Sequence, residues 1–179
     1  RETTWSMLDS RDYVCGGYQW AGIEHRGETV WPRLCSQSGA LDLFLQPKDA
    51  YYQNQSHWSA TPMVHLLPHW NLAGREGETV TVWAYTNGAA VELLQDGKSL
   101  GTQYPGPYGH GVWQVTYQPG QLKALAYDVA GNMVAQDVIE TTGQPERLVL
   151  RLEDPDVRAD GEDVAILTCY CEDSKGRMV

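Results

Sequence analysis

Apolar and polar residues alternate in short runs through the middle of the chain, from residue 62 to residue 143. Because successive side chains of a β-strand point to opposite faces, such alternation predicts strands with one buried face. In residues 79–86, for example, Val80, Val82 and Ala84 share the face expected to be buried. Further runs of this kind are found at 63–67, 99–104, 112–117, 122–126 and 133–141.

Turn signals separate these runs. Asn87-Gly88 and Asp96-Gly97 are pairs that tolerate the positive φ of tight turns, and they bracket one more strand. Pro119-Gly120 and Gly131-Asn132 mark two later turns. About seven short strands at roughly ten-residue spacing are typical of two packed antiparallel sheets. Residues 60–143 are therefore predicted to form an immunoglobulin-like β-sandwich.

The chain before this region follows a different pattern. A short helix is predicted within residues 4–13, and the aromatic and β-branched residues of 13–20 predict a buried strand. A loop rich in glycine, proline and charge follows over 22–38, and Pro47 opens a helix that extends to Gln55. A strand, a long loop and a helix in this order are typical of one β/α unit of an α/β barrel.

The last part of the chain, residues 144–179, begins another β module. Residues 147–153 and 164–172 alternate as two strands, with a turn at Asp160-Gly161. Two strands cannot bury a sheet face by themselves, so we expect the start of a longer, truncated domain.

The four cysteines, Cys15, Cys35, Cys169 and Cys171, are too few and too scattered for a disulfide scaffold. Cys169 and Cys171 are expected on the buried face of the last strand, as small apolar residues. A metal site there would need a second Cys or His pair at ligand spacing, and the sequence has none.

Composition restricts the partners. Acidic residues outnumber basic ones by 23 to 13, which gives the 179-residue chain a net charge of −10. Nucleic acid is not expected as a partner, because its binding relies on basic residues that neutralise phosphates. No apolar stretch approaches the ~20 residues that span a bilayer, so no membrane partner is expected. Seven Trp and ten Tyr against one Phe suit sugar faces and wet interfaces as well as ordinary cores.

A series of motifs runs along nearly the whole chain. Residues 11–28 have the sequence RDYVCGGYQWAGIEHRGE, in which Glu24 and His25 follow a Gly-Gly-Tyr-Gln-Trp run. The later segments are 36–43, 47–52, 62–71, 91–101 and 117–124. In this order the motifs resemble glycoside hydrolase family 2, in its bacterial β-galactosidase branch. Glu24 stands where that family usually has Asp, and His25 where it usually has Tyr.

The resemblance implies a mainly β fold in three parts. Residues 1–59 would be the last β/α unit of a (β/α)₈ barrel, 60–143 the immunoglobulin-like sandwich, and 144–179 the start of a second sandwich. The chain would be the non-catalytic C-terminal portion of a retaining glycosidase, which completes and scaffolds the barrel. Its partners would be the rest of the barrel and, in the parent enzyme, a β-galactoside or a related carbohydrate.

The resemblance also implies where the chemistry lies. A retaining glycosidase needs two carboxylates about 5–5.5 Å apart, and in this family both would lie upstream of Arg1. We therefore expect no catalytic residue, no metal and no cofactor in this segment, and no activity from it alone. The sequence leaves the compartment open among the bacterial cytoplasm, the periplasm and the medium, for a soluble protein.

Trp20 and Glu24 are the expected substrate-binding residues. Trp20 would stand at the carboxyl end of a barrel strand, where the active sites of barrels form. The resemblance implies that Trp20 floors the sugar subsite and precedes a cis peptide bond to Ala21; a barrel-core position is the alternative. Glu24 would accept sugar hydroxyls or orient neighbouring loops, or it is a solvated loop acid. Because Glu24 and Glu28 lie in a loop, their spacing does not indicate a catalytic pair.

Three further aromatic residues, Trp83, Tyr104 and Tyr108, are candidates for contact with a carbohydrate or another domain. For Trp83, packing is favoured over ligand binding, and the loop 104–110 is alternatively a stiff connection between strands. Two other functions stay open: a carbohydrate-binding β-sandwich module, and a homo-oligomeric assembly module that exchanges strands at unpaired edges.

Two polar motifs are not expected to form functional sites. His65 and His69 flank the stretch before the sandwich and are expected to be hydrogen-bonded linker residues rather than metal ligands. Asn54-Gln55-Ser56 fits the glycosylation acceptor pattern, which is frequent by chance.

Overall fold

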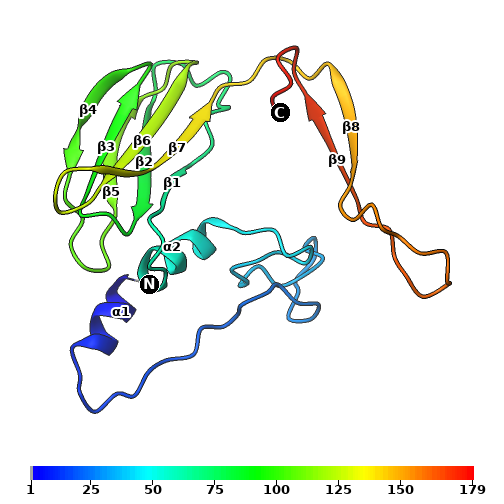
Figure 1. Cartoon of the computed structure of the whole chain (residues 1–179), viewed down its shortest axis with the longest axis horizontal. Helices are drawn as coiled ribbons and strands as arrows, with labels where there is room; N and C mark the ends of the chain where they lie inside the picture. Colours follow the sequence, from blue (N-terminus) through cyan, green and yellow to red (C-terminus); the bar gives the residue numbers. More distant parts are fainter. Residues whose placement is uncertain (1) are drawn as a thin grey trace. The chain divides into compact units, whose positions relative to one another are not determined.

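Antiparallel strands make up most of the regular structure (Figure 1). The computed structural model describes residues 2–179, in two compact units: one ends at Ile139, and the other extends from Glu140 to Val179. The helices are α1 (Glu2–Asp9) and α2 (Asp49–Trp58). The strands are β1 (Val64–Leu67), β2 (Thr79–Thr86), β3 (Ala90–Gln95), β4 (Lys98–Gln103), β5 (Gly111–Thr116), β6 (Gln121–Tyr127), β7 (Met133–Glu140), β8 (Arg147–Leu152) and β9 (Leu167–Glu172).

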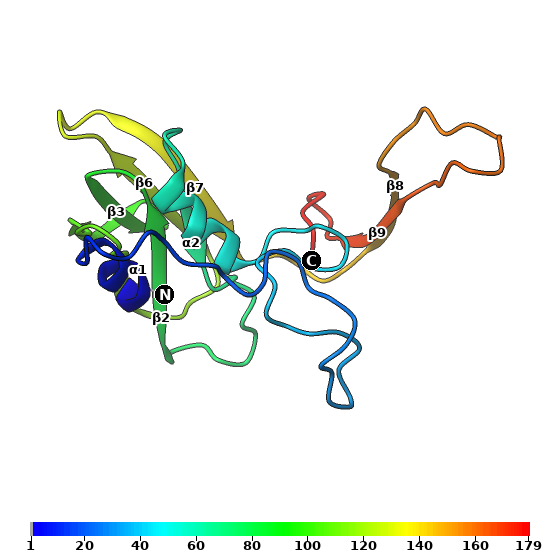
Figure 2. The same cartoon turned by 90° about the horizontal axis from the view of Figure 1, so that it is seen from below.

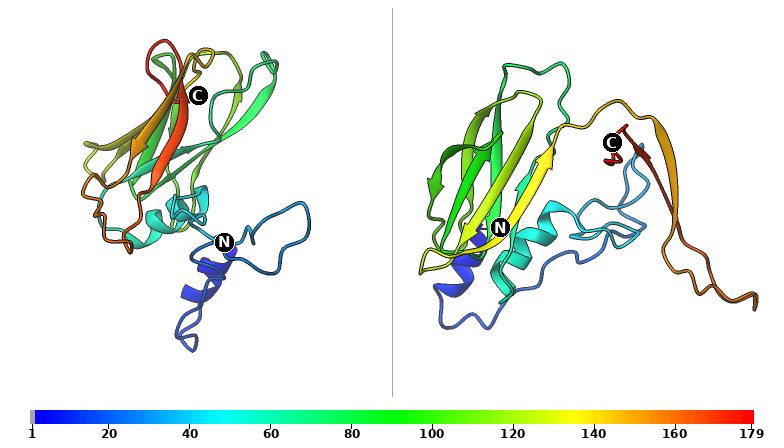
Figure 3. Two further views of the ribbon diagram at one scale, coloured as in Figure 1. Left: turned by 90° about the vertical axis from the view of Figure 1, so that its right-hand side faces the viewer. Right: turned by 45° about the horizontal axis from the view of Figure 1, so that its top comes forward.

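Strands β1 to β7 form a sandwich of two sheets (Figure 3). One sheet has the order β1-β2-β5 and the other the order β4-β3-β6-β7. Val80, Val82 and Ala84 of β2 share one buried core with Val91 and Leu93 of β3. The alternation in the sequence therefore predicted correctly which face of β2 is buried. The predicted mainly β, immunoglobulin-like fold class is also confirmed. The three predicted domains and the barrel origin of residues 1–59 stay predictions.

The two predicted turns around β3 differ in what they connect. At Asp96-Gly97, both residues have positive φ, 48° and 81°, and the turn closes the hairpin between β3 and β4. Asn87-Gly88 instead joins β2 to β3, which lie in different sheets. Asn87 accepts a hydrogen bond from the Met63 backbone N–H at 2.8 Å. This residue therefore ties the chain before β1 to the end of β2.

An aromatic pair closes one end of the sandwich core. Trp70 and Tyr117 are both fully buried, with ring centroids 5.0 Å apart and ring planes at 74°. Each polar tip has a partner: Trp70 Nε1 donates to the Gln118 carbonyl at 3.1 Å, and Tyr117 Oη accepts from the Leu72 N–H at 3.2 Å. These bonds satisfy the polar groups that burial of the two rings would otherwise leave unpaired.

The helices α1 and α2 both lie beside the sandwich (Figure 2), and they pack together through aromatic rings. Trp5 of α1 lies edge-on to Trp58 of α2, with ring centroids 5.2 Å apart. On the other side, α2 lies against β1 and β2, and Tyr52 stacks on His65 with ring centroids 3.7 Å apart. His65 Nε2 also lies 3.1 Å from Asp49 Oδ1.

Both histidines are hydrogen-bonded, as predicted, but His65 lies within β1 rather than in a linker. His65 has the contacts with Tyr52 and Asp49 just described, and His69 Nδ1 accepts a hydrogen bond from the Asn71 N–H at 3.2 Å.

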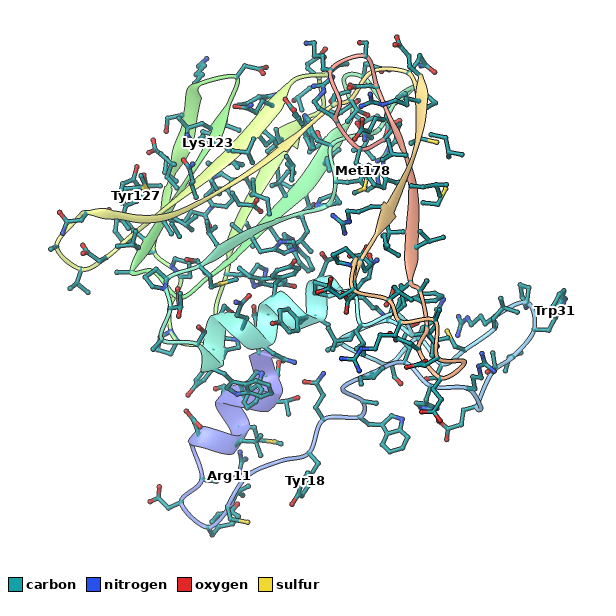
Figure 4. All side chains as sticks on the ribbon, turned by 45° about the vertical axis from the view of Figure 1, so that its right-hand side comes forward. Arg11, Tyr18, Trp31, Lys123, Tyr127 and Met178 are labelled. Carbon is teal, nitrogen blue, oxygen red and sulfur yellow. The ribbon has the colours of Figure 1, made fainter. Side chains whose placement is uncertain are left out.

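The predicted buried strand at 13–20 is wrong for this structure. These residues form no strand, and Tyr13, Tyr18 and Trp20 are exposed; Figure 4 shows Tyr18 pointing away from the ribbon. A strand needs a neighbour to pair its backbone N–H and C=O groups, and none of the described residues supplies one here.

The second unit contains an antiparallel hairpin of β8 and β9. Leu148 pairs with Cys171, Leu150 with Cys169, and Leu152 with Leu167, so one face of the hairpin is apolar. The expected burial of both cysteines is wrong, since Cys169 is exposed and Cys171 only partly covered. Among the described residues of this unit, no second sheet or helix covers the apolar face. The sequence pattern predicted this, because two strands cannot bury a sheet face by themselves.

Across residues 2–179 the structure has no helix that is both long and apolar enough to cross a membrane.

Candidate functional site

Trp20 lies at the start of a loop that a second loop holds by backbone hydrogen bonds. The Ala21 N–H donates to Ser38 O at 3.3 Å, and the Ala40 N–H donates to Ala21 O at 3.1 Å. The Leu41 N–H donates to Gly22 O, and the Glu24 N–H donates back to Leu41 O, both at 2.9 Å. Residues 21–24 and 38–41 thus form a short paired segment directly after Trp20, which we call the Trp20 loop pair.

Gly39 allows the two segments of the Trp20 loop pair to approach each other closely. A Cβ at this position would lie within 3 Å of backbone atoms of Ile23, Glu24 and Leu41. Because those are backbone atoms, no rotamer change could relieve the clash. A side chain at Gly39 would therefore push the two loops apart.

Glu24 lies inside the Trp20 loop pair rather than in solvent, with a side chain only 11% exposed. Lys48 Nζ donates to Glu24 Oε1 at 2.5 Å, and the Cys35 thiol donates to Glu24 Oε2 at 3.3 Å. The hydrogen bond from Lys48, followed by that from Cys35, lowers the pKa of Glu24, whereas the same carboxylate raises the pKa of Cys35. Glu24 is therefore not a solvated loop acid in this structure, because both of its carboxylate oxygens accept hydrogen bonds within the loops.

His25 lies between Trp20 and Glu28. Its ring centroid is 5.4 Å from that of Trp20, with the planes at 75°, and its Nε2 is 4.0 Å from Glu28 Oε2. This buried nitrogen has no hydrogen bond within the described part of the chain. Glu28 is exposed, in a loop and with φ of 51°, so Glu24 and Glu28 are not paired on a helix face.

The peptide bond between Trp20 and Ala21 is cis. The resemblance implied this bond, and the structure confirms it. Trp20 itself is 71% exposed. The position offers a flat indole face on a loop that several hydrogen bonds hold, an arrangement that can stack on the apolar face of a sugar ring.

The other aromatic candidates lie at the sandwich. Trp83 packs against His110, with ring centroids 5.0 Å apart, and the His110 ring also makes a hydrogen bond with the Glu2 carboxylate of α1. Trp83 thus has a ring contact within the chain while 38% of it stays exposed, and its role stays a prediction. Tyr104 is exposed, whereas Tyr108 contacts the His57 ring at 5.6 Å. The structure does not bring these three residues together with Trp20 into one site.

Sequence reasoning missed several residues that shape these regions. In the sequence, Lys48 simply follows Pro47 at the predicted helix start, and Cys35 is one of four scattered cysteines. Their partner Glu24 is 24 and 11 residues away, so no local spacing could have pointed to the contacts. His57 and His110 join aromatic clusters for the same long-range reason.

The loops around Trp20 leave much apolar surface uncovered. The exposed large apolar residues here are Tyr13, Tyr18, Trp20, Ile23, Val30, Trp31, Leu34, Leu43, Phe44 and Leu45. Beside them, an open groove of about 480 Å³ is lined mostly by apolar atoms and includes Asn54 and Trp58. This part of the chain therefore exposes more large apolar side chains than the sandwich core does.

Asn54 is 7% exposed, and its Nδ2 donates to Gln19 Oε1 at 2.9 Å. Its Oδ1 is buried without a hydrogen bond in the described residues. This buried helical position also excludes Asn54 as an accessible glycosylation acceptor in this structure. Within residues 2–179, no group of three or more His, Cys, Asp or Glu is arranged to hold a metal ion.

The known proteins that this chain resembles in sequence include named glycosidases. A family described as "Domain of unknown function (DUF4982)" matches residues 77–135. The chain is 35% identical, over 99% of its length, to "Beta-galactosidase BoGH2A" of Bacteroides ovatus, and 32% identical, over 97%, to a "Putative beta-glucuronidase" of Formosa agariphila. It spans only 21% and 18% of these relatives, about a fifth of their length.

Solved structures agree with the sequence relatives. The chain superimposes over 99% of its length on a β-glycosidase from Bacteroides vulgatus, with a TM-score of 0.91 and 34% identity. A glycosyl hydrolase family 2 member from Bacteroides cellulosilyticus gives a TM-score of 0.86 and 29% identity, again over 99% of the chain. The chain covers 23% and 26% of those two proteins.

Proposed function

Because this chain is homologous to a segment of the family 2 glycoside hydrolases, we propose that it is a non-catalytic part of a larger retaining β-glycosidase. It supplies the last β/α unit of the catalytic barrel and the sandwich that supports it. The substrate of the whole enzyme is a β-galactoside. The match to a named β-galactosidase, at 35% identity over 99% of the chain, carries this proposal.

The uncovered apolar surface around Trp20 supports the proposed place in a barrel. Residues 13–20 form no helix or strand and are mostly exposed, and the groove beside Asn54 and Trp58 is apolar and open. In a closed barrel, flanking strands would pair the backbone of 13–20, and neighbouring elements would cover these side chains. A donor from such an element would also satisfy the buried Oδ1 of Asn54.

In this proposal, Trp20 forms the floor of a sugar subsite and the reacting carboxylates come from the rest of the enzyme. A retaining mechanism uses one carboxylate as nucleophile and one as acid and base, about 5–5.5 Å apart. Glu24 is a poor candidate for either role, because Lys48 and Cys35 occupy both of its oxygens. Its part is to orient the loops that carry Trp20.

The test compares the isolated chain with the full-length protein that contains it. We expect the full-length protein to hydrolyse a chromogenic β-galactoside, and the isolated chain not to. Trp20→Ala should lower kcat/KM of the full-length protein roughly 10- to 100-fold, or about 1.4–2.8 kcal/mol of lost interaction. Val129→Ala is the control, since Val129 is exposed in the turn after β6, away from this surface.

Two results would contradict the proposal. One is hydrolysis of the galactoside by the isolated chain at the rate of the full-length protein. The other is a full-length protein that does not cleave a β-galactoside; cleavage of a β-glucuronide instead would place the protein with the relatives named for that substrate.

A second candidate function, carbohydrate binding by the sandwich, has one observation in its favour. A groove of about 340 Å³ lies among His57, Asn87 and Tyr108, and the residues that line it carry no charge at neutral pH. Burial lowers the pKa of His57, which keeps its imidazole neutral. Neutral polar groups beside an aromatic ring suit a sugar. Titration of galactosides into the isolated chain, followed by calorimetry, tests this: no heat would exclude it.

A further inference from the structure

Lys48 connects three segments that meet at the Trp20 loop pair. Its backbone N–H donates to Ala40 O at 3.0 Å, and its Nζ donates to Gln37 O at 3.0 Å and to Glu24 Oε1 at 2.5 Å. The residue directly precedes α2, which starts at Asp49. Lys48 therefore joins the start of α2 to both loops of the pair.

The contact between Lys48 and Glu24 is better protected than an ordinary surface ion pair. The two side chains are 34% and 11% exposed, and Cys35 donates to the second carboxylate oxygen. A charge-assisted hydrogen bond in such a setting fixes geometry more firmly than a solvated pair does. By contrast, Arg75 and Glu78 form an exposed pair, with side chains 49% and 55% exposed.

Trp20 depends on the loop pair for its position. Its ring contacts His25, the residue after Glu24, and the chain from Ala21 to Glu24 is bonded to residues 38–41. Trp20 is itself 71% exposed, so the described residues of this chain pack little against its indole. A change in the loop pair would therefore move the indole.

We infer that Lys48 is a positioning residue for the sugar-binding face of Trp20, and that it acts through Glu24. This inference rests on the proposed function. Lys48 and Glu24 do not touch the sugar; they keep the loop after Trp20 at a fixed distance from α2. Loss of this bridge should weaken sugar binding in the ground state and the transition state alike, so KM rises and kcat changes little.

The experiment is a double-mutant cycle between Lys48 and Trp20 in the full-length protein, assayed with a chromogenic β-galactoside. Lys48→Met removes the ammonium group and keeps most of the aliphatic chain. We expect it to raise KM about tenfold and to change kcat less than twofold. Lys48→Arg keeps the cation and should recover most of the loss, while the matched control Arg75→Met should leave both constants unchanged.

The cycle separates positioning from a merely structural role. In a Trp20→Ala background, Lys48→Met should have no further effect on KM, because the indole that it positions is gone. Glu24→Gln should reproduce a part of the Lys48→Met effect. Thermal melts of all variants verify that they are folded.

Each outcome bears on one of the two ideas. If the unmodified full-length protein hydrolyses no β-glycoside, the proposed function fails and this inference falls with it. If that protein is active but Lys48→Met matches it, or costs the same factor with and without Trp20, only the positioning role is overturned.

Discussion

Glu24 shows how its neighbours decide what a single side chain can do. Its place four residues after Trp20 made a direct sugar contact one reasonable prediction, which stays untested. In the structure, Lys48 and Cys35 bond its two oxygens, and this arrangement supports a role in holding loops. The local sequence indicated that the residue was near a site, whereas partners 24 and 11 residues away determine its chemistry.

Tyr117 gives a prediction at the same scale. Tyr117→Phe removes the buried oxygen that accepts a hydrogen bond from the N–H of the partly buried Leu72. Because a partly buried donor then loses its partner, the free energy of unfolding should fall by about 1 kcal/mol. Urea denaturation of the isolated chain, followed by far-UV circular dichroism, measures the change.

Tyr104→Phe is the matched control, because Tyr104 is exposed. We expect it to change the free energy of unfolding by less than about 0.5 kcal/mol. Equal effects of the two substitutions would contradict the assigned role of the Tyr117 hydroxyl.

Among the elements, the sandwich strands were predictable and the strand at 13–20 was not. In β2, alternation selects Val82 and its neighbours for one face, and strands β1 and β5 pair its two edges. Residues 13–20 have comparable strand-forming side chains but no pairing partner among residues 2–179. Strand propensity depends on what the strand packs against, so side-chain type alone could not decide the outcome.

The stability of the turn after β9 should depend on pH through Asp173. Asp173 accepts backbone hydrogen bonds from Gly143, Lys175 and Arg177, and the Arg177 guanidinium lies 2.6 Å from its Oδ2. These bonds, the Arg177 side chain first, hold the pKa of Asp173 far below its ordinary value of 3.8. A lowered folded-state pKa stabilises the fold above pH 3.8 and less as the pH falls towards the folded value.

Asp173→Asn should therefore speed amide exchange in β9 at pH 7, and the difference from the unmodified chain should shrink as the pH falls below 3.8. Hydrogen exchange followed by NMR measures this. Asp156→Asn is the control, since Asp156 is exposed in the same unit. A difference that grows with acidity would show that Asp173 does not stabilise the turn as a carboxylate.

For the whole molecule, regular structure is distributed unevenly along the chain. Between the end of α1 at Asp9 and the start of α2 at Asp49, the structure has isolated bridges but no helix or strand. From Val64 to Glu140, by contrast, paired strands share one core. Segments with few protected backbone groups open locally at little cost in free energy.

Limited proteolysis tests this difference. In the isolated chain, trypsin should cleave after Arg26 and Arg33 at least about tenfold faster than after Lys123, which lies in β6 and pairs with β3. Mass spectrometry of a time course identifies the cut sites. In the full-length protein, the proposed barrel should protect Arg26 and Arg33. Early cleavage after Lys123 would contradict the assigned stability of the sandwich.

The amino-acid sequence by itself determined where the sandwich strands lie and which of their faces is buried, because period-two alternation is a local property that each strand carries. It also contained the ordered motifs by which the chain resembles family 2 glycoside hydrolases. Only the tertiary structure decided that Lys48 reaches Glu24, that Gly39 lets two loops meet, and that Trp20 stands exposed above them. Those features depend on which distant segments come together, and pairing of this kind leaves no periodic pattern along the chain.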